Sequence, residues 1–161
     1  MRIMKKLSTK NSHTKRIYFD ANAIIPIFLA EIQTERHVQV MRVIEDAMND
    51  SSLLFVTPLC VDEVLYSMFR FFRSTNTLHA QAIDEIFEKL SALLAMEFFQ
   101  YESATSSVSD IQTIHSYMTL YNLQPRDAFH LLNYKKLKCD AFFTFDTDFD
   151  VAQKHGAIKL Y

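Results

Sequence analysis

The sequence is poor in the residues that form tight turns. Its 161 residues include one Gly and three Pro. A β-sandwich or β-barrel needs many tight turns, which Gly and Pro favour, so the composition argues against both architectures. Hydrophobic residues make up 49% of the chain and charged residues 22%, as is ordinary for a globular protein. A chain of this length can bury a sizeable core. We therefore expect one domain, over residues 16–161, of helices joined to a few strands.

Cysteine and long apolar runs are also scarce. The two cysteines, Cys60 and Cys139, lie far apart without the spacing of a metal site, and no secretory leader precedes them. No apolar run approaches the roughly 18 residues that a membrane-spanning helix requires. These absences predict a soluble, cytoplasmic protein that has reduced, mostly buried thiols and does not associate with membranes.

Charge is unevenly distributed along the chain. The formal net charge is −2, yet residues 1–16 contain six basic residues and no acid, whereas the rest contains 11 basic and 19 acidic residues. A basic segment can contact the phosphates of a nucleic acid. It can equally be a solvated chain terminus. We treat residues 1–15 as a basic N-terminal tail and leave both explanations open.

The rest of the chain alternates between strand-like and helix-like patterns. Thr57-Pro58 is a strong helix start, because Thr is a favoured N-cap and Pro suits the first helical position. The helix that follows is apolar on nearly every side, so we expect it to be buried. This alternation predicts an α/β fold with a central, mainly parallel sheet of four to five strands. We expect strands at 16–20, 53–56, 96–101, 141–145 and 157–160, and helices at 21–29, 34–48, 57–72, 78–94, 109–121 and 125–137.

Three acidic residues fall where a strand ends or a helix begins. Asp20 closes the first apolar strand, Asp127 follows the Pro125 helix start, and Asp146 follows the most strand-like run of the chain. Each has an ordinary structural explanation, because Asp is favoured as an N-cap, near the positive end of a helix and in turns. In a parallel sheet, however, the carboxyl ends of the strands converge at one edge. We therefore expect these acids to lie close together.

Glu63 is the hardest acid to explain structurally. It lies one turn inside the most apolar helix, where burial of an unpaired carboxylate costs several kcal/mol. The helix offers no basic partner before Arg70, and the adjacent Asp62 points elsewhere because successive helical residues diverge by about 100°. Carboxylates gathered at one edge repel each other unless a cation is bound. Ligands of oxygen alone suit Mg²⁺ or Mn²⁺ and metal-assisted hydrolysis of phosphodiesters.

The four segments that contain Asp20, Glu63, Asp127 and Asp146 resemble a known family. Their order and spacing are similar to the four successive motifs of PIN-domain ribonucleases, and the resemblance spans residues 16–160, with small VapC-type toxins of toxin–antitoxin pairs closest in appearance. It implies a three-layer α/β/α fold, a divalent-metal-dependent endoribonuclease that hydrolyses RNA, a homodimer, and a cognate antitoxin whose helix covers an apolar groove. The four segments are residues 17–22, 57–63, 126–131 and 143–149.

The resemblance also implies roles for individual residues. Asn22 stands where the family more often has Thr or Ser, and Thr144 matches the hydroxyl that precedes the fourth acid. Asp148 matches a further acid, and whether it or Asp146 lies closer to the metal is open. The long basic N-terminus departs from the family pattern. The implied catalytic and metal-binding residues are Asp20, Glu63, Asp127 and Asp146, with Asn22, Thr144 and Asp148 in support.

Two other functions compete with this interpretation. One is a catalytically silent PIN-like module that binds RNA or protein, although the complete acidic set favours an enzyme. The other is a metal-dependent phosphatase or DNA nuclease on a related sheet. The phosphatase often needs a second Asp two residues after the first, where this chain has Asn22.

His130 shares a helix face with Asp127, and we expect it to pack in the core or support the acids.

Overall fold

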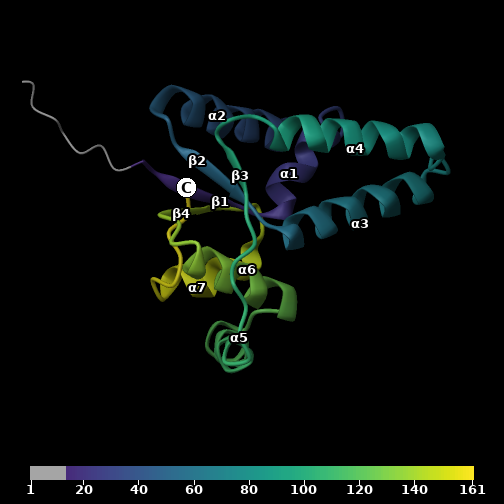
Figure 1. The fold of residues 1–161 in the computed structure, drawn as a ribbon. Helices are drawn as coiled ribbons and strands as arrows, with labels where there is room; N and C mark the ends of the chain where they lie inside the picture. Colours follow the sequence, from purple (N-terminus) through teal and green to yellow (C-terminus); the bar gives the residue numbers. More distant parts are fainter. Residues whose placement is uncertain (1–13) are drawn as a thin grey trace, which may run out of the picture.

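The computed structural model describes residues 14–161, so all but the last two residues of the predicted basic tail lie outside the described residues. Strands and helices alternate over the described part of the chain (Figure 1). The strands are β1 (Arg16–Phe19), β2 (Leu53–Val56), β3 (Phe99–Tyr101) and β4 (Ala141–Phe143). The helices are α1 (Ala21–Phe28), α2 (Thr34–Asp50), α3 (Pro58–Ser74), α4 (Ala80–Leu94), α5 (Asp110–Tyr121), α6 (Pro125–Lys136) and α7 (Asp150–Lys154), with a 3₁₀ turn, η1 (Thr147–Phe149), before α7.

The sheet is entirely parallel and has the order β3-β2-β1-β4. β1 lies inside the sheet, where Tyr18 is opposite Phe55 of β2 and Phe142 of β4. All four strands therefore end at the same edge, and the segments that follow them begin there. The prediction of an α/β fold around a parallel sheet is confirmed.

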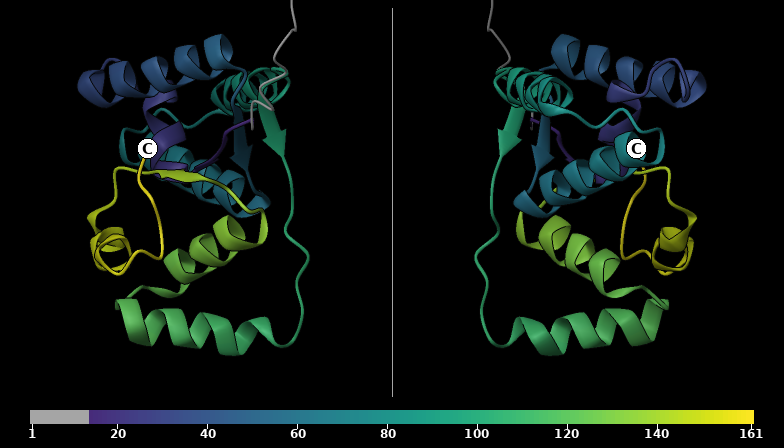
Figure 2. Two further views of the ribbon diagram at one scale, coloured as in Figure 1. Left: turned by 90° about the vertical axis from the view of Figure 1, so that its left-hand side faces the viewer. Right: turned by 90° about the vertical axis from the view of Figure 1, so that its right-hand side faces the viewer.

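Helices cover both faces of the sheet. Helices α1 to α4 lie on one side and α5 to α7 on the other, giving three layers (Figures 1 and 2). Ile17, Tyr18 and Phe19 are all fully buried, because successive side chains of β1 point to opposite faces and both faces are covered. This double burial accounts for the unbroken apolar run that precedes Asp20.

The fifth strand expected at residues 157–160 does not form. Leu160 makes only an isolated parallel bridge with Phe142, supported by hydrogen bonds from the Phe142 N–H to the Lys159 carbonyl and from the Tyr161 N–H to the Phe142 carbonyl. Within the described residues, pairing of this segment with β4 is thus limited to one residue. β3 and β4 are likewise shorter than the strands predicted at 96–101 and 141–145.

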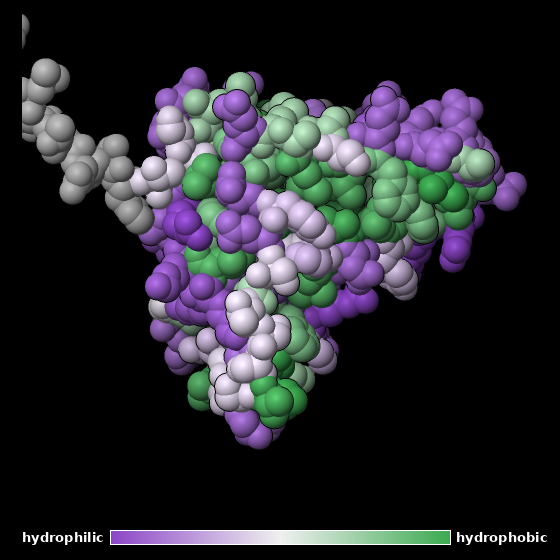
Figure 3. Space-filling model, in the orientation of Figure 1, coloured by the Kyte–Doolittle hydropathy of each residue, from purple (hydrophilic) through white to green (hydrophobic). Residues whose placement is uncertain are grey.

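Helix α3 is less buried than its composition predicts. Within it only Cys60, Val64 and Met68 are buried, while Tyr66 is 56% exposed. The second half of α3 lies beside α4 and projects with it beyond the sheet (Figure 1). Apolar surface follows this α3–α4 arm (Figure 3). The apolar character of α3 thus serves a helical arm as well as the core.

The start of the described chain is held against the sheet. The Lys15 ammonium lies 4.0 Å from the centre of the Tyr161 ring, and the Arg16 guanidinium donates to the Leu137 carbonyl. Lys15, which the sequence places in the tail, therefore packs on the folded part. Within residues 14–161, every helix is too short or too polar to cross a lipid bilayer.

Candidate functional site

Asp20 lies at the carboxyl edge of the sheet, directly after Phe19 ends β1. Its Oδ1 accepts a hydrogen bond from the Ala21 N–H at 2.7 Å, which makes it the N-cap of α1. Its Oδ2 accepts from the Thr144 hydroxyl at 2.8 Å, and its own N–H donates to the Phe143 carbonyl at 3.1 Å. The side chain is only 6% exposed. The capping explanation and the placement at the sheet edge both hold for this residue.

Glu63 reaches the same edge from α3. Thr57 caps that helix and Pro58 occupies its first position, as predicted, so the register of α3 is fixed from its start. The Glu63 side chain is 15% exposed, and its Oε1 lies 3.7 Å from Nε of Arg126. The neighbouring Asp62 is 68% exposed, which confirms that it faces solvent.

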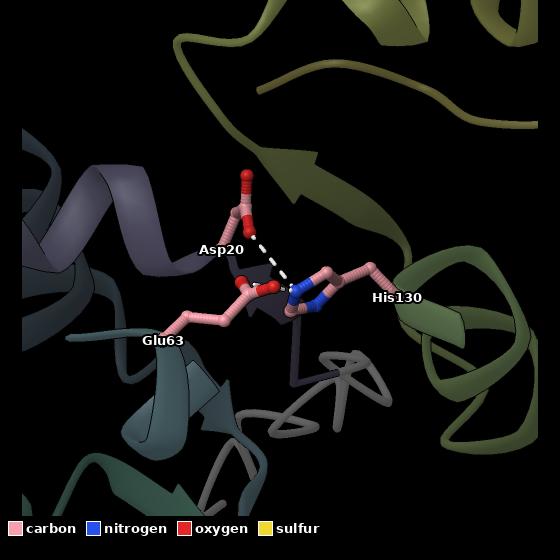
Figure 4. A group of neighbouring side chains, drawn as sticks. All are labelled: Asp20, Glu63 and His130. Carbon is pink, nitrogen blue, oxygen red and sulfur yellow. Dashed lines mark hydrogen bonds and ion pairs between the residues drawn. The ribbon is translucent and has the colours of Figure 1, made fainter. Parts of the chain in front are cut away.

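His130 joins the two acids (Figure 4). Its Nε2 lies 2.7 Å from Oε2 of Glu63 and 3.5 Å from Oδ1 of Asp20, and its ring is almost fully buried. Its Nδ1 lies 2.9 Å from the Tyr18 hydroxyl. Among residues 14–161, Asp20, Glu63 and His130 form a tight group whose ligand atoms all lie within 4.8 Å of one another.

The remaining acids line the same cleft. Asp127 stands in the first turn of α6, Asp146 follows β4, and Asp148 lies within η1. Asp146 Oδ1 accepts from the Asp148 N–H at 2.9 Å, so Asp146 caps η1. Together with Asp20 and Glu63 these residues border an open cleft of about 640 Å³. The structure therefore brings all four predicted acids to one cavity from four different segments.

Two polar side chains support this edge from behind. The Asn22 side-chain oxygen accepts from the Phe145 N–H at 2.9 Å and ties the start of α1 to the segment after β4. Thr144 donates its hydroxyl proton to Asp20 and accepts from the Asp146 N–H at 3.0 Å. Thr144 thus contacts both Asp20 and Asp146, and Asn22 contacts Thr144 and the Phe145 backbone beside them.

Crowding of the acids changes their protonation. Burial, and after it the negative charges of Asp146 and Asp20, raise the pKa of Asp127 to about 6. Burial also raises the pKa of Asp20, although the charge of His130 and the hydrogen bond from Thr144 oppose that rise. The cleft therefore holds more negative charge than its own hydrogen bonds neutralise.

For His130, burial and the neighbouring groups shift the pKa in opposite directions. Burial alone would lower the pKa of its imidazole, but hydrogen bonds with Cys60 and Glu63 and the charge of Asp20 raise the pKa well above its usual value. The ring is the nearest positive group to the two buried acids. Sequence reasoning placed His130 near Asp127 but could not identify Glu63 as its partner, since the two residues are 67 positions apart.

The rim of the cleft carries two further side chains that sequence reasoning missed. Tyr66 is 56% exposed, and the Arg126 guanidinium carbon lies 5.7 Å from the centre of its ring. Arg126 also lies 3.9 Å from Asp62 and 3.7 Å from Glu63. Tyr66 follows Glu63 by three positions on α3 and Arg126 directly precedes Asp127, so helical spacing was the available signal.

The donor set of the cleft fits a hard divalent cation. Carboxylate oxygens dominate it, and the raised pKa of Asp127 reflects negative charge that a cation would offset. His130 adds an imidazole nitrogen to the tight group, a ligand type that suits Mn²⁺ or Zn²⁺ better than Mg²⁺. Its contacts with two carboxylates equally suit a hydrogen-bond donor.

Comparison with known proteins agrees with this arrangement. The family model of the PIN domain matches residues 17–155, which include the whole sheet apart from Arg16 and every acid of the cleft. No curated protein matches the chain. PIN domains are generally nucleases, so the match supports a nuclease-type activity on phosphodiester bonds. With a parallel sheet, an acidic cleft at its carboxyl edge and a match over almost all of the described residues, the chain belongs to the PIN-domain family.

Proposed function

We propose that the protein is a divalent-metal-dependent endoribonuclease and the toxin of a toxin–antitoxin pair. The observation that carries the proposal is the convergence of Asp20, Glu63, Asp127 and Asp146 on one open cleft. These residues come from four separate segments, and their proximity raises the pKa of Asp127 to about 6 through burial and the charges of its neighbours. Such crowding disfavours the metal-free protein and favours one that has bound a cation.

Mg²⁺ or Mn²⁺ would be held by these four acids. When bound, such an ion polarises a phosphodiester oxygen and lowers the pKa of water. The chain itself keeps the acids in place: Thr144 and the Ala21 N–H hold Asp20, and His130 holds Glu63. Burial and the neighbouring negative charges raise the pKa of Asp127 to about 6, so this residue links cation binding to pH.

Single-stranded RNA is the proposed substrate. Tyr66 offers an exposed aromatic ring beside the acids, and stacking of a base on such a ring contributes about 1–3 kcal/mol. Arg126 offers a half-exposed guanidinium at the same rim, which suits contact with a phosphate. A base and its neighbouring phosphate would then lie side by side at this rim of the acidic cleft.

A second copy and an antitoxin are the proposed protein partners. Apolar surface along the α3–α4 arm (Figure 3) supports a docking helix there, with Phe87 of α4 46% exposed. We also propose that the protein acts in the cytoplasm, a reducing compartment, because Cys60 and Cys139 are both buried and unpaired.

Cleavage of single-stranded RNA with and without Mg²⁺ or Mn²⁺ tests the proposal. We expect cleavage that chelator abolishes and that Asp20→Asn or Glu63→Gln reduces severely. Asp62→Asn is the matched control, since Asp62 neighbours Glu63 but faces solvent. Undiminished cleavage in chelator or by Asp20→Asn would contradict the proposal. Binding of RNA without cleavage by the wild-type protein would indicate a silent binding module, and preference for single-stranded DNA of the same sequence would reassign the substrate.

A further inference from the structure

A buried chain of hydrogen bonds runs from the start of α3 to the acidic cleft. The Thr57 hydroxyl lies 3.2 Å from the Tyr18 hydroxyl, which lies 2.9 Å from Nδ1 of His130. Nε2 of His130 then lies 2.7 Å from Oε2 of Glu63. Thr57, Tyr18 and His130 are each at most 1% exposed. The chain joins β1, α3 and α6 and ends on an acid of the cleft.

The protons of this chain can be assigned from its partners. Nε2 of His130 faces carboxylate oxygens of Glu63 and Asp20, which only accept hydrogen bonds when ionised, so Nε2 carries a proton. Nδ1 accepts the Tyr18 hydroxyl proton while the ring is neutral and donates to the Tyr18 oxygen once the ring is protonated, and the Tyr18 and Thr57 hydroxyls share the next hydrogen bond. The adjacent Cys60 thiol donates to the Phe19 carbonyl at 3.0 Å. Every polar group of the chain has a partner in this scheme.

Glu63 depends on His130 more than Asp20 does. Asp20 is held on both oxygens by the Ala21 N–H and the Thr144 hydroxyl. Glu63 has a longer side chain, and within residues 14–161 its basic partners are His130, at 2.7 Å, and Arg126, at 3.7 Å. Fixing a flexible Glu side chain in one orientation costs conformational entropy. A donor held rigidly in the core can offset that cost.

We infer that His130 is a positioning residue, which holds Glu63 and Asp20 in orientation for a cation through its Nε2–H while the Tyr18 hydroxyl locks its ring. This inference rests on the proposed metal-dependent function and refines it. The competing role is that of a metal ligand. A ligand would have to turn the Nε2 lone pair toward the cation and give up both contacts with the carboxylates. The 2.7 Å separation from Glu63 is that of a charge-assisted hydrogen bond.

Titration calorimetry with Mn²⁺ alone tests the inference on full-length variants. We expect His130→Ala to weaken Mn²⁺ binding by about 10–100-fold, since outer partners of metal-binding carboxylates contribute about that much. Tyr18→Phe keeps the ring but removes the hydroxyl, so its loss should be smaller and in the same direction. His130→Gln should recover part of the affinity, because its amide can donate toward Glu63 but lacks the imidazole lone pair.

Tyr134→Phe is the matched control. Tyr134 is also a buried tyrosine, its ring centre lies 6.5 Å from that of Tyr18, and its hydroxyl bonds the backbone of Lys159. Its removal should leave Mn²⁺ affinity unchanged. Wild-type affinity in folded His130→Ala and Tyr18→Phe would overturn the inference. Failure of the wild-type protein itself to bind Mn²⁺ would instead defeat the proposed function.

Nuclear magnetic resonance of the His130 imidazole in the wild-type protein provides a second test, which does not depend on the folding of any variant. Long-range ¹H–¹⁵N correlations report which ring nitrogen carries a proton. We expect a proton on Nε2 of His130 in chelator and again at saturating Mg²⁺. Loss of that proton on addition of Mg²⁺ would assign His130 as a ligand, and a proton on Nδ1 alone in chelator would remove the donor. Either result would overturn the inference.

Discussion

The two sides of the acidic cleft are built differently. Asp20 and Glu63, the buried pair, are 6% and 15% exposed and accept hydrogen bonds from Thr144, Ala21 and His130. Asp127, Asp146 and Asp148, the rim acids, are partly or fully exposed. Asp127 owes its raised pKa first to burial and then to the charges of other acids. The fold orients the buried pair before a cation arrives, whereas at the rim Asp127 adjusts through its proton.

The largest expected effect separates the two sides directly. Asp20→Asn should reduce kcat/KM for RNA about a hundredfold to a thousandfold, because a metal-assisted reaction loses several kcal/mol of charge stabilisation. Asp148→Asn should cost about tenfold or less, since Asp148 is exposed and lies in the 3₁₀ turn at the rim. Initial cleavage rates at saturating Mn²⁺ measure both. An equal loss in the two variants would remove the distinction between buried pair and rim.

The pH response should come from the rim. Cation binding needs ionised carboxylates, and the pKa of Asp127 is raised to about 6 by burial and by its acidic neighbours. Mn²⁺ affinity should therefore rise as pH increases through about 6 and level off above it. Calorimetry across this range measures the rise, and Asp127→Asn should flatten it. A profile that Asp127→Asn leaves unchanged would assign the proton to another group.

The free energy of unfolding of the metal-free protein should fall with rising pH, whereas Mn²⁺ affinity should increase. A carboxyl whose folded-state pKa is raised stabilises the folded protein only while it is protonated, so the cost of Asp127 is absent at low pH and complete above about pH 6. Because Asp127 is partly exposed, this cost is reduced by solvent. Asp127→Asn should therefore raise the free energy of unfolding by about 1 kcal/mol at neutral pH, or Tm by about 2–4 °C.

Thermal unfolding in chelator compares Asp127→Asn with the wild-type protein. The gain in Tm should shrink in mildly acidic buffer, where the wild-type carboxyl is protonated. Asp84→Asn is the control, because Asp84 is an exposed acid of α4. A gain that persists unchanged at acidic pH would show that charge repulsion is not its source.

The smallest effect is expected at Arg126. This side chain is 54% exposed and lies on the rim, so it should contact RNA without holding the cation. Arg126→Ala should raise KM several-fold with little change in kcat, and it should reduce the salt dependence of RNA binding by about one counterion. Fluorescence anisotropy over a range of salt concentrations measures this slope. An unchanged slope would place the RNA elsewhere.

Local signals in the sequence were sufficient for much of the fold. Thr57-Pro58 fixed the start of α3 because capping depends on residues within one turn. Asp20 was identified because the apolar run before it stops abruptly, and the parallel sheet then placed it beside Glu63. Strand ends and helix starts are local features, and the parallel sheet then brings the residues at these positions to one edge.

Long-range partners could not be read from the sequence. On its own helix, Glu63 has no basic residue before Arg70. Its partners in the structure are His130 and Arg126 from α6. Pairing across 67 positions depends on how α3 and α6 pack on opposite faces of β1, which no spacing rule encodes. The strand expected around Leu160 failed for a similar reason, because pairing depends on where the chain returns to β4.

Diffraction from crystals grown with Mn²⁺ tests the central claim most directly. The anomalous signal of Mn²⁺ locates the ion independently of any assumption about its ligands. The account predicts a peak in the cleft within about 2–2.5 Å of carboxylate oxygens of both Asp20 and Glu63, with His130 still hydrogen-bonded to Glu63. A cleft without a peak at saturating Mn²⁺, or an ion bound away from Asp20 and Glu63, would contradict it.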